Sequence, residues 1–329
     1  MRSAVIGLGD IAPTHLSAIE KNERIQLAAV CDIDETRRHI APGAPFYLDY
    51  REMLEKEKLD CVHICLPHWL HYPVALDAAK AGCNIFAEKP LALNTAQALK
   101  FLELEREFGV RVCICFQNRR NPTTEFLLKE LRSNKHGALT GIYGNVAWNR
   151  SKQYYSDKPW RGIFEKSGGG CMINQAIHTM DLMQYLAGSP IESIKGSISN
   201  ILDYGLDVED SAMASITFKS GAKGLFISSV ANYEDLSVSI NVECEKASFY
   251  INDGRLYRKG EQDLLLACDS VESAGKRYYG GSHAKLIAEF YEALERGEGD
   301  CITARDALVS IQMIDAVRES SSTGRRVLF

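Results

Sequence analysis

Ala4-Val-Ile-Gly7-Leu-Gly9-Asp-Ile-Ala12 lies near the start of the 329-residue chain and decides the fold of its first part. The three leading apolar residues predict a short buried strand, and the residues after them match Gly-x-Gly-x-x-Gly/Ala at the start of an expected helix, residues 11–21. Gly7 permits a tight turn, Gly9 lets a pyrophosphate approach the backbone, and Ala12 keeps the helix close to the sheet. A helix N-terminus also favours phosphate charge. The stretch is interpreted as a dinucleotide-binding fingerprint formed by Gly7, Gly9, Asp10, Ile11 and Ala12.

A carboxylate at the end of the next expected strand supports this interpretation. Residues 26–31 predict a strand that ends in Asp32, 23 residues after Gly9, near the spacing of about 20 expected for a ribose-binding acid. Asp32 would accept hydrogen bonds from the ribose hydroxyls and repel a 2′-phosphate, so NAD is expected and NADP is disfavoured. Arg37 lies close enough to reach such a phosphate and is a candidate cofactor ligand, although Arg37 and Arg38 also fit a solvated helix.

The strand and helix pattern continues and then changes. Strands expected at residues 60–65, 84–87 and 111–116 alternate with helices at 70–81 and 94–108, which predicts a doubly wound parallel sheet, or Rossmann domain, over residues 1–120. Residues 121–329 predict an α+β domain with a largely antiparallel open sheet. Its expected helices are residues 123–132, 284–296 and 304–319, the last of which could pack back on the first domain. Its expected strands are residues 139–148, 191–200, 211–219, 222–230, 236–242 and 247–251.

Charged residues follow the strand in Asn84-Ile-Phe-Ala-Glu-Lys-Pro-Leu-Ala-Leu93. Ligands of parallel sheets collect at the carboxyl ends of strands, so Lys89 is expected where a cofactor and a substrate could meet. Pro90 keeps Lys89 out of the helical region, and a plain surface turn is the alternative. Further candidate cofactor contacts at strand ends are Pro67, His68, His71, Glu88 and Gln117. Because no third ligand accompanies His68 and His71, we expect no metal site there.

Bulk composition excludes several classes of function. Apolar residues make up 46% and charged residues 25% of the chain, and the net charge of −5 gives no sign of a nucleic-acid surface. The chain shows no signal peptide and no membrane-spanning run, so a cytoplasmic protein is expected. The ten cysteines are spread along the chain without a Cys-x-x-Cys pair, and we interpret them as small buried hydrophobic residues. No metal is expected.

A second polar group follows a triple glycine at residues 168–170. The helix expected after the glycines places Asn174, His178 and Asp181 on nearly one face, because their spacings are four and three residues. A lone histidine in such a helix is usually a core residue. Three polar groups on one stripe favour a functional site.

The combined motifs resemble the Gfo/Idh/MocA family, named for glucose-fructose oxidoreductase, inositol dehydrogenase and a rhizopine-catabolism protein. The resemblance spans essentially the whole chain and includes the fingerprint, Glu88-Lys-Pro90, Trp160-Arg-Gly162, the block from Gly168 to Asp181, and the stretches beginning at Gly281 and Ser321. It implies that Lys89 and His178 act on a sugar or cyclitol hydroxyl. The family commonly has aspartate where this chain has Asn174, so His178 lacks that carboxylate.

The resulting hypothesis is an NAD(P)-dependent dehydrogenase or reductase for a sugar, nucleotide sugar or inositol, with no nucleic-acid or membrane partner. His178 can serve as the base and Lys89 can stabilise charge on the reacting oxygen, with Asn174 beside them. Further candidates for cofactor contacts are Trp160 and Arg161, and for substrate contacts Asn118, Tyr154, Arg161 and His283. A non-catalytic NAD(P)-sensing regulator and an NAD-dependent glycosidase remain as alternatives. A sheet with one uncovered face suggests a homodimer or homotetramer.

Overall fold

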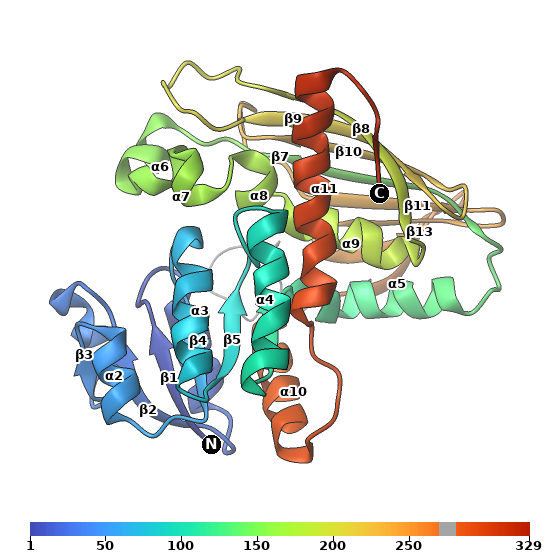
Figure 1. Cartoon of the computed structure of the whole chain (residues 1–329). Helices are drawn as coiled ribbons and strands as arrows, with labels where there is room; N and C mark the ends of the chain where they lie inside the picture. Colours follow the sequence, from blue (N-terminus) through green and yellow to red (C-terminus); the bar gives the residue numbers. More distant parts are fainter. Residues whose placement is uncertain (270–280) are drawn as a thin grey trace. The chain divides into compact units, whose positions relative to one another are not determined.

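The computed structural model describes residues 1–269 and 281–329. They form two compact units (Figure 1). Unit 1 contains Met1–Gln117 and Ser282–Leu308, and unit 2 contains Asn118–Gly281 and Val309–Phe329. The sequence-based division at residue 120 assigned residues 282–308 to the second domain, whereas they belong to unit 1.

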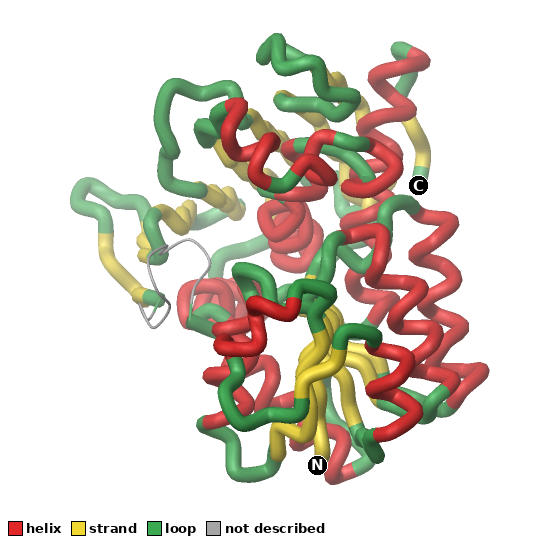
Figure 2. The backbone as a smooth tube through the Cα atoms, turned by 90° about the vertical axis from the view of Figure 1, so that its left-hand side faces the viewer, coloured by secondary structure: helices red, strands yellow, loops and turns green. Residues whose placement is uncertain are grey.

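Unit 1 is built on a six-stranded, all-parallel sheet in the order β3-β2-β1-β4-β5-β6, which confirms the predicted doubly wound fold. Figure 2 shows helices on both sides of this sheet, and the four residues of β4 and of β6 are therefore all buried. The strands are β1 (Arg2–Ile6), β2 (Gln26–Cys31), β3 (Phe46–Tyr47), β4 (Cys61–Ile64), β5 (Asn84–Glu88) and β6 (Val112–Cys115).

The helices of unit 1 follow local sequence signals. Asn94 caps the N-terminus of α4 by accepting from the Gln97 N–H at 2.9 Å, and Gly109 ends that helix with φ +68°. Short 3-10 helices occupy Glu35–Ile40 and His68–Leu70. The α-helices are α1 (Ala12–Glu20), α2 (Tyr50–Lys56), α3 (His71–Lys80), α4 (Thr95–Phe108) and α10 (His283–Arg296).

Helix α10 joins unit 1 because its amphipathic face finds partners there. Leu286, Ile287 and Phe290 are buried, and α10 packs against α1 and β6. The Tyr291 hydroxyl also lies 2.5 Å from Ser3 Oγ in β1. Its apolar periodicity predicted the helix, but periodicity alone does not identify the surface that the helix covers.

Unit 2 is built on a nine-stranded sheet in the order β14-β13-β12-β11-β7-β10-β9-β8-β15. All pairs are antiparallel except β10 with β7, in agreement with the predicted largely antiparallel sheet. The strands are β7 (Leu139–Ala147), β8 (Ile191–Ser199), β9 (Ser211–Phe218), β10 (Lys223–Ser229), β11 (Ser239–Cys244), β12 (Ser248–Asn252), β13 (Arg255–Arg258), β14 (Leu264–Cys268) and β15 (Val327–Leu328).

One face of this sheet is buried and the other is exposed. Along β9 and β10, buried residues alternate with exposed ones, which include Met213 at 53% and Leu225 at 41% exposure. Helices α8 and α9 contact the sheet. The helices of unit 2 are α5 (Pro122–Arg132), α6 (Lys152–Asp157), α7 (Phe164–Ser167), α8 (Cys171–Asn174), α9 (Ile177–Ala187) and the greater part of α11 (Ala304–Thr323), with a 3-10 helix at Pro159–Gly162.

One strand begins later than its apolar pattern predicts. The expected strand at residues 236–242 starts at Ser239, because the preceding residues form a loop tied to the end of β7. There the Leu236 N–H donates to the Ala147 carbonyl at 2.9 Å, and Trp148 Nε1 donates to the Leu236 carbonyl at 3.1 Å. Among the described residues, no helix has the length and apolar character needed to cross a membrane.

Candidate active site

The glycine-rich loop between β1 and α1 has a shape that only glycine permits at one position. Gly7 has φ +93°, and a Cβ there would lie 2.4 Å from the Cys65 carbonyl oxygen. At Gly9 an added Cβ would meet only Arg37 Nη1, at 3.7 Å, so the backbone is open on that side. Ile11, at the N-cap of α1, has no side-chain acceptor for the first-turn N–H groups. The loop therefore fits a pyrophosphate at the N-terminus of α1.

Asp32 follows β2, and its carboxylate is held by the glycine-rich loop. Its Oδ2 accepts the Leu8 N–H at 2.7 Å, and its Oδ1 accepts the Asp34 N–H at 2.9 Å. Arg37 lies at the same rim, where it donates to the Leu8 carbonyl at 3.1 Å and pairs with Asp34 at 3.3 Å. Its Nη1 is also 3.7 Å from Asp32 Oδ2. The structure thus places Arg37 beside the fingerprint, with both acids near its guanidinium.

Pro67, His68 and His71 follow β4, and His71, the first residue of α3, connects this segment to the loop after β5. The His71 ring nitrogens lie 2.8 Å from the Pro90 carbonyl oxygen and 2.7 Å from the Leu66 carbonyl oxygen. His68 is also buried. Because both ring nitrogens of His71 are engaged by carbonyl oxygens, its role here is to join two strand-end loops.

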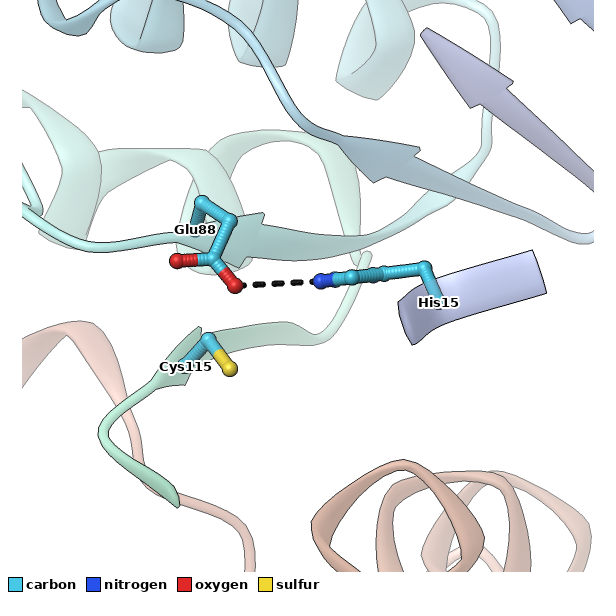
Figure 3. A group of neighbouring side chains, drawn as sticks. All are labelled: His15, Glu88 and Cys115. Carbon is cyan, nitrogen blue, oxygen red and sulfur yellow. Dashed lines mark hydrogen bonds and ion pairs between the residues drawn. The ribbon is translucent and has the colours of Figure 1, made fainter. Parts of the chain in front are cut away.

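Glu88 is the last residue of β5, and its carboxylate is buried. Its Oε1 lies 3.0 Å from His15 Nε2, and Figure 3 shows the two groups facing each other with Cys115 beside them. Burial opposes charge on both groups. Nevertheless, Cys65 and Glu88 raise the pKa of His15 to about 10, and His15 holds the pKa of Glu88 well below its ordinary value. The pair is therefore an imidazolium and a carboxylate. Lys89 comes directly after Glu88, and the Lys89–Pro90 peptide bond is cis.

A chain of buried hydrogen bonds continues from His15. His15 Nδ1 lies 3.0 Å from His63 Nδ1, and His63 Nε2 lies 2.9 Å from the Tyr291 hydroxyl, which contacts Ser3. Burial keeps the pKa of His63 well below its ordinary value, so its neutral ring accepts from His15 at Nδ1 and donates to Tyr291 from Nε2. The chain connects α1, β4, α10 and β1.

Two predicted contact residues therefore lie inside unit 1. Glu88 is 7% exposed and His283 is 5% exposed. Nε2 of His283 is 3.7 Å from Glu88 Oε1, and burial lowers the pKa of His283 to about 4. A cofactor contact for Glu88 and a substrate contact for His283 stay predictions, and both side chains belong to the buried histidine cluster.

The same cluster contains residue types that bind metals. Ligand atoms of His15, Glu88 and Cys115 lie within 4.8 Å of one another. In the structure, His15 and Glu88 form a direct hydrogen bond with each other, and Cys115 Sγ lies 3.8 Å from Gln117 Oε1. Spacing along the chain gave no sign of this group, and the expected absence of a metal stays a prediction.

In unit 2, the expected continuous helix over Asn174, His178 and Asp181 is wrong. Helix α8 ends at Asn174 and α9 begins at Ile177, with a break at Gln175 and Ala176. The three residues therefore do not share one helical face. The triple glycine serves close packing, because a Cβ on Gly170 would lie 1.7 Å from the Glu209 carbonyl oxygen.

Asp181 forms a buried ion pair and does not join Asn174 and His178 in one polar group. Its two oxygens accept from Arg119 Nε at 2.8 Å and Nη2 at 2.6 Å, and Ser310 Oγ lies 3.3 Å away. The Arg119 guanidinium also lies over the Tyr185 ring, 4.5 Å from its centroid. This bidentate pair connects the segment before α5 to α9. Arg119 was not among the residues predicted from the sequence, and nothing in the local pattern indicated its partner.

Three predicted contact residues lie together in unit 2. The Arg161 guanidinium lies 4.1 Å from the Tyr154 ring centroid and 5.9 Å from that of Trp160. Gln175 Nε2 donates to the Tyr154 hydroxyl at 2.9 Å, which connects this group to the residue after Asn174. Gln175 was not among the residues predicted from the sequence. Of the proposed acid-base residues, Lys89 belongs to unit 1, and Asn174 and the buried His178 belong to unit 2.

Comparison with family models gives matches over most of the chain. Residues 1–116 match GFO_IDH_MocA, described as an oxidoreductase family with an NAD-binding Rossmann fold. Residues 127–250 match the GFO/IDH/MocA C-terminal domain.

Individual relatives are similar over nearly their whole lengths. D-glucoside 3-dehydrogenase of Escherichia coli is 26% identical, with 99% of this chain and 97% of the relative covered. Myo-inositol 2-dehydrogenase of Thermotoga maritima is 25% identical, with 99% and 98% covered. Among solved structures, the WlbA dehydrogenase of Bordetella pertussis in complex with NADH and UDP-GlcNAcA has a TM-score of 0.86 and 26% identity, with 100% of this chain and 98% of that chain covered.

Proposed function

Because the chain belongs to the GFO/IDH/MocA family of oxidoreductases with an NAD-binding Rossmann fold, we propose that it transfers hydride between a nicotinamide dinucleotide and a CH–OH carbon of a sugar, nucleotide sugar or inositol. The activities for which the related D-glucoside 3-dehydrogenase and myo-inositol 2-dehydrogenase are named support this class of substrate.

One relationship in unit 1 carries the proposal. The glycine-rich loop leaves the carboxyl end of β1, and Lys89 follows the carboxyl end of β5, with β4 between these two strands. Cofactors of open parallel sheets bind along this edge. A cationic side chain at the same edge suits a group that acts on the substrate oxygen while the loop holds the pyrophosphate.

The proposed chemistry assigns one task to each side chain. Bound nicotinamide would supply the acceptor for the hydride that leaves the substrate carbon during oxidation. His178 takes the hydroxyl proton, and the Lys89 ammonium donates a hydrogen bond to the same oxygen, which stabilises its developing negative charge. Asn174 offers an amide for hydrogen bonding and no charge. In the reverse direction His178 returns the proton to the oxygen, and Lys89 polarises the carbonyl.

We further propose that NAD is preferred over NADP. A 2′-phosphate would face the Asp32 carboxylate, whose orientation is fixed by the Leu8 and Asp34 N–H groups. The Arg37 guanidinium already pairs with Asp34 and lies near Asp32, so part of its charge is compensated. A phosphate would have to compete with these acids for Arg37.

In unit 2, Tyr154, Trp160, Arg161 and Gln175 are the proposed polar contacts of the substrate or nicotinamide. Their hydroxyl, indole, guanidinium and amide groups suit a polyol ligand.

A screen with NAD and NADP across sugars, inositols and nucleotide sugars tests the proposal. The expected result is formation of reduced nicotinamide, measured by absorbance, with at least one substrate. Release of free sugar from a glycoside without net reduction would instead support the glycosidase alternative. Dinucleotide binding without turnover of any substrate would support a regulator.

The exposed face of the nine-stranded sheet is the proposed surface for a homodimer or homotetramer. Met213 and Leu225 are large apolar side chains on exposed positions of two neighbouring strands. Light scattering should give a multiple of the chain mass, and Met213→Glu combined with Leu225→Glu should lower it. A monomeric wild-type protein at micromolar concentration would contradict this proposal.

A further inference from the structure

A cavity of about 440 Å³ lies within unit 2, beside the helix that carries His178. Its walls come from the start of α5, from α9, from the loop before β11 and from the turn between β12 and β13. The volume lies in the range of about 300–1,000 Å³ typical of small-molecule sites.

Hydrogen bonds hold two walls of the cavity in place. Asp235 accepts the Asn149 N–H at 2.8 Å and pairs with Arg150 at 2.9 Å, which fixes the loop before β11. Asp269 accepts the Thr123 N–H at 2.9 Å, and its own N–H donates to the Gly254 carbonyl at 2.7 Å. These contacts join the start of α5 to the β12–β13 turn. The cavity is therefore largely preformed.

Buried polar atoms in the lining lack hydrogen-bond partners within the described part of the chain. They are the amide oxygens Asn118 Oδ1 and Asn121 Oδ1, and Asn121 is 6% exposed. Leaving such atoms unpaired is unfavourable, so a ligand or water should satisfy them. Both oxygens accept hydrogen bonds. A ligand that carries several hydroxyl donors matches this set.

The charge of the lining selects against anions. Among the described residues that line the cavity, Asp235, Asp253 and Asp269 are acidic and none is Lys, Arg or His. The burial that raises the pKa of the Asp269 carboxyl would also disfavour the charge of a bound anion. A phosphate-bearing ligand would therefore be repelled. Aliphatic side chains, among them Leu182 and Ile251, complete the lining and suit the C–H face of a sugar ring.

The position of the cavity connects it to the proposed catalytic histidine. Thr179 and Leu182, which line the cavity, are one and four positions after His178 on α9. Resting on the proposed function, we propose that this cavity binds the second sugar unit of a neutral glycoside while the first unit is presented to His178. The substrate class is then a disaccharide or similar neutral glycoside, in place of a free monosaccharide or a nucleotide sugar.

Calorimetric titration of the full chain saturated with NADH tests the inference without turnover. The probes are glucose, maltose, cellobiose, sucrose and UDP-glucose. At least one disaccharide should bind about tenfold or more tightly than glucose, and UDP-glucose should gain no such advantage. Asn121→Ala removes one of the unpaired amide oxygens, and it should weaken disaccharide binding about fivefold, as for one lost hydrogen bond. Glucose binding should stay within twofold.

A second variant fills the space directly. Ile251→Phe should abolish the tighter binding of the disaccharide relative to glucose, whereas the matched control Ile251→Val should preserve it. Thermal unfolding checks that both variants are folded. The inference is overturned if no disaccharide binds more tightly than glucose, if both sugars respond equally to the variants, or if UDP-glucose is the ligand that Ile251→Phe excludes. Selective disaccharide binding without nicotinamide reduction would uphold the cavity and count against the proposed function.

Discussion

In the interior of unit 1, His15 Nε2 lies 3.0 Å from Oε1 of Glu88, the residue directly before Lys89. The pair holds a positive and a negative charge away from water, with the neutral His63 ring on the far side of His15. Removing either charge would leave the other buried without compensation. The pair therefore predicts a defined dependence of stability on pH.

The first prediction concerns alkaline pH. The pKa of His15 rises from the ordinary value of 6.5, taken for the unfolded chain, to about 10 in the folded chain. The stabilisation of the fold by protonated His15 should therefore be complete below pH 6.5. Above this pH it should decline by at most about 1.4 kcal/mol per pH unit, and it should be lost near pH 10. Urea unfolding of wild type and His15→Gln, measured across this range, should show a difference that shrinks as pH rises. A difference that stays constant would mean that His15 is neutral in the folded protein.

The second prediction separates two glycines of the same loop. Gly7→Ala should lower the unfolding temperature strongly, because its Cβ would lie 2.4 Å from the Cys65 carbonyl oxygen at φ +93°. Gly9→Ala should fold like wild type, since its Cβ meets only Arg37 Nη1 at 3.7 Å, but should weaken NAD binding by occupying the open space above the loop. Calorimetry and thermal unfolding measure the two effects. Equal NAD affinity in Gly9→Ala would place the pyrophosphate elsewhere.

The third prediction concerns cofactor choice. Wild type should bind NAD more tightly than NADP, and Asp32→Ser should narrow or invert this preference. The expected change is about tenfold, which corresponds to about 1.4 kcal/mol. Adding Arg37→Gln to Asp32→Ser should then weaken NADP more than NAD. Tighter binding of NADP by the wild type would show that Arg37, and not Asp32, sets the preference.

The fourth prediction concerns Asn174. Asn174→Asp should move the acidic limb of the kcat/KM profile for alcohol oxidation to higher pH, because a carboxylate stabilises the protonated imidazole of His178. The size of the shift depends on how closely the end of α8 approaches α9, since the break at Gln175 removes the spacing of one helical turn. His178→Ala is the control and should remove the limb together with most activity. An unmoved acidic limb in an active Asn174→Asp enzyme would show that the side chains at positions 174 and 178 do not interact.

Local patterns predicted the fold well. The strand expected at residues 26–31 is β2 (Gln26–Cys31), and the helix expected to end before Gly109 ends at Phe108. Eight of the ten cysteines are buried, as their apolar surroundings indicated. These features depend on neighbours in the sequence, which is why composition and periodicity reveal them.

The site was less predictable because its contacts join distant segments. His63 and Tyr291 are 228 residues apart, and Arg119 and Asp181 are 62 apart. No local rule predicts such partners. The break between α8 and α9 was also missed, because neither Gly nor Pro marks Gln175 and Ala176.

The most direct test of the account compares Lys89→Met with wild type in both NAD binding and sugar oxidation. The variant should bind NAD within about twofold of wild type and lose roughly a hundredfold or more of its turnover, because Lys89 acts on the substrate oxygen and the glycine-rich loop holds the dinucleotide. Lys80→Met, which alters an exposed lysine at the end of α3, should change neither property. A Lys89→Met enzyme that turns over within a few-fold of wild type would contradict the catalytic assignment.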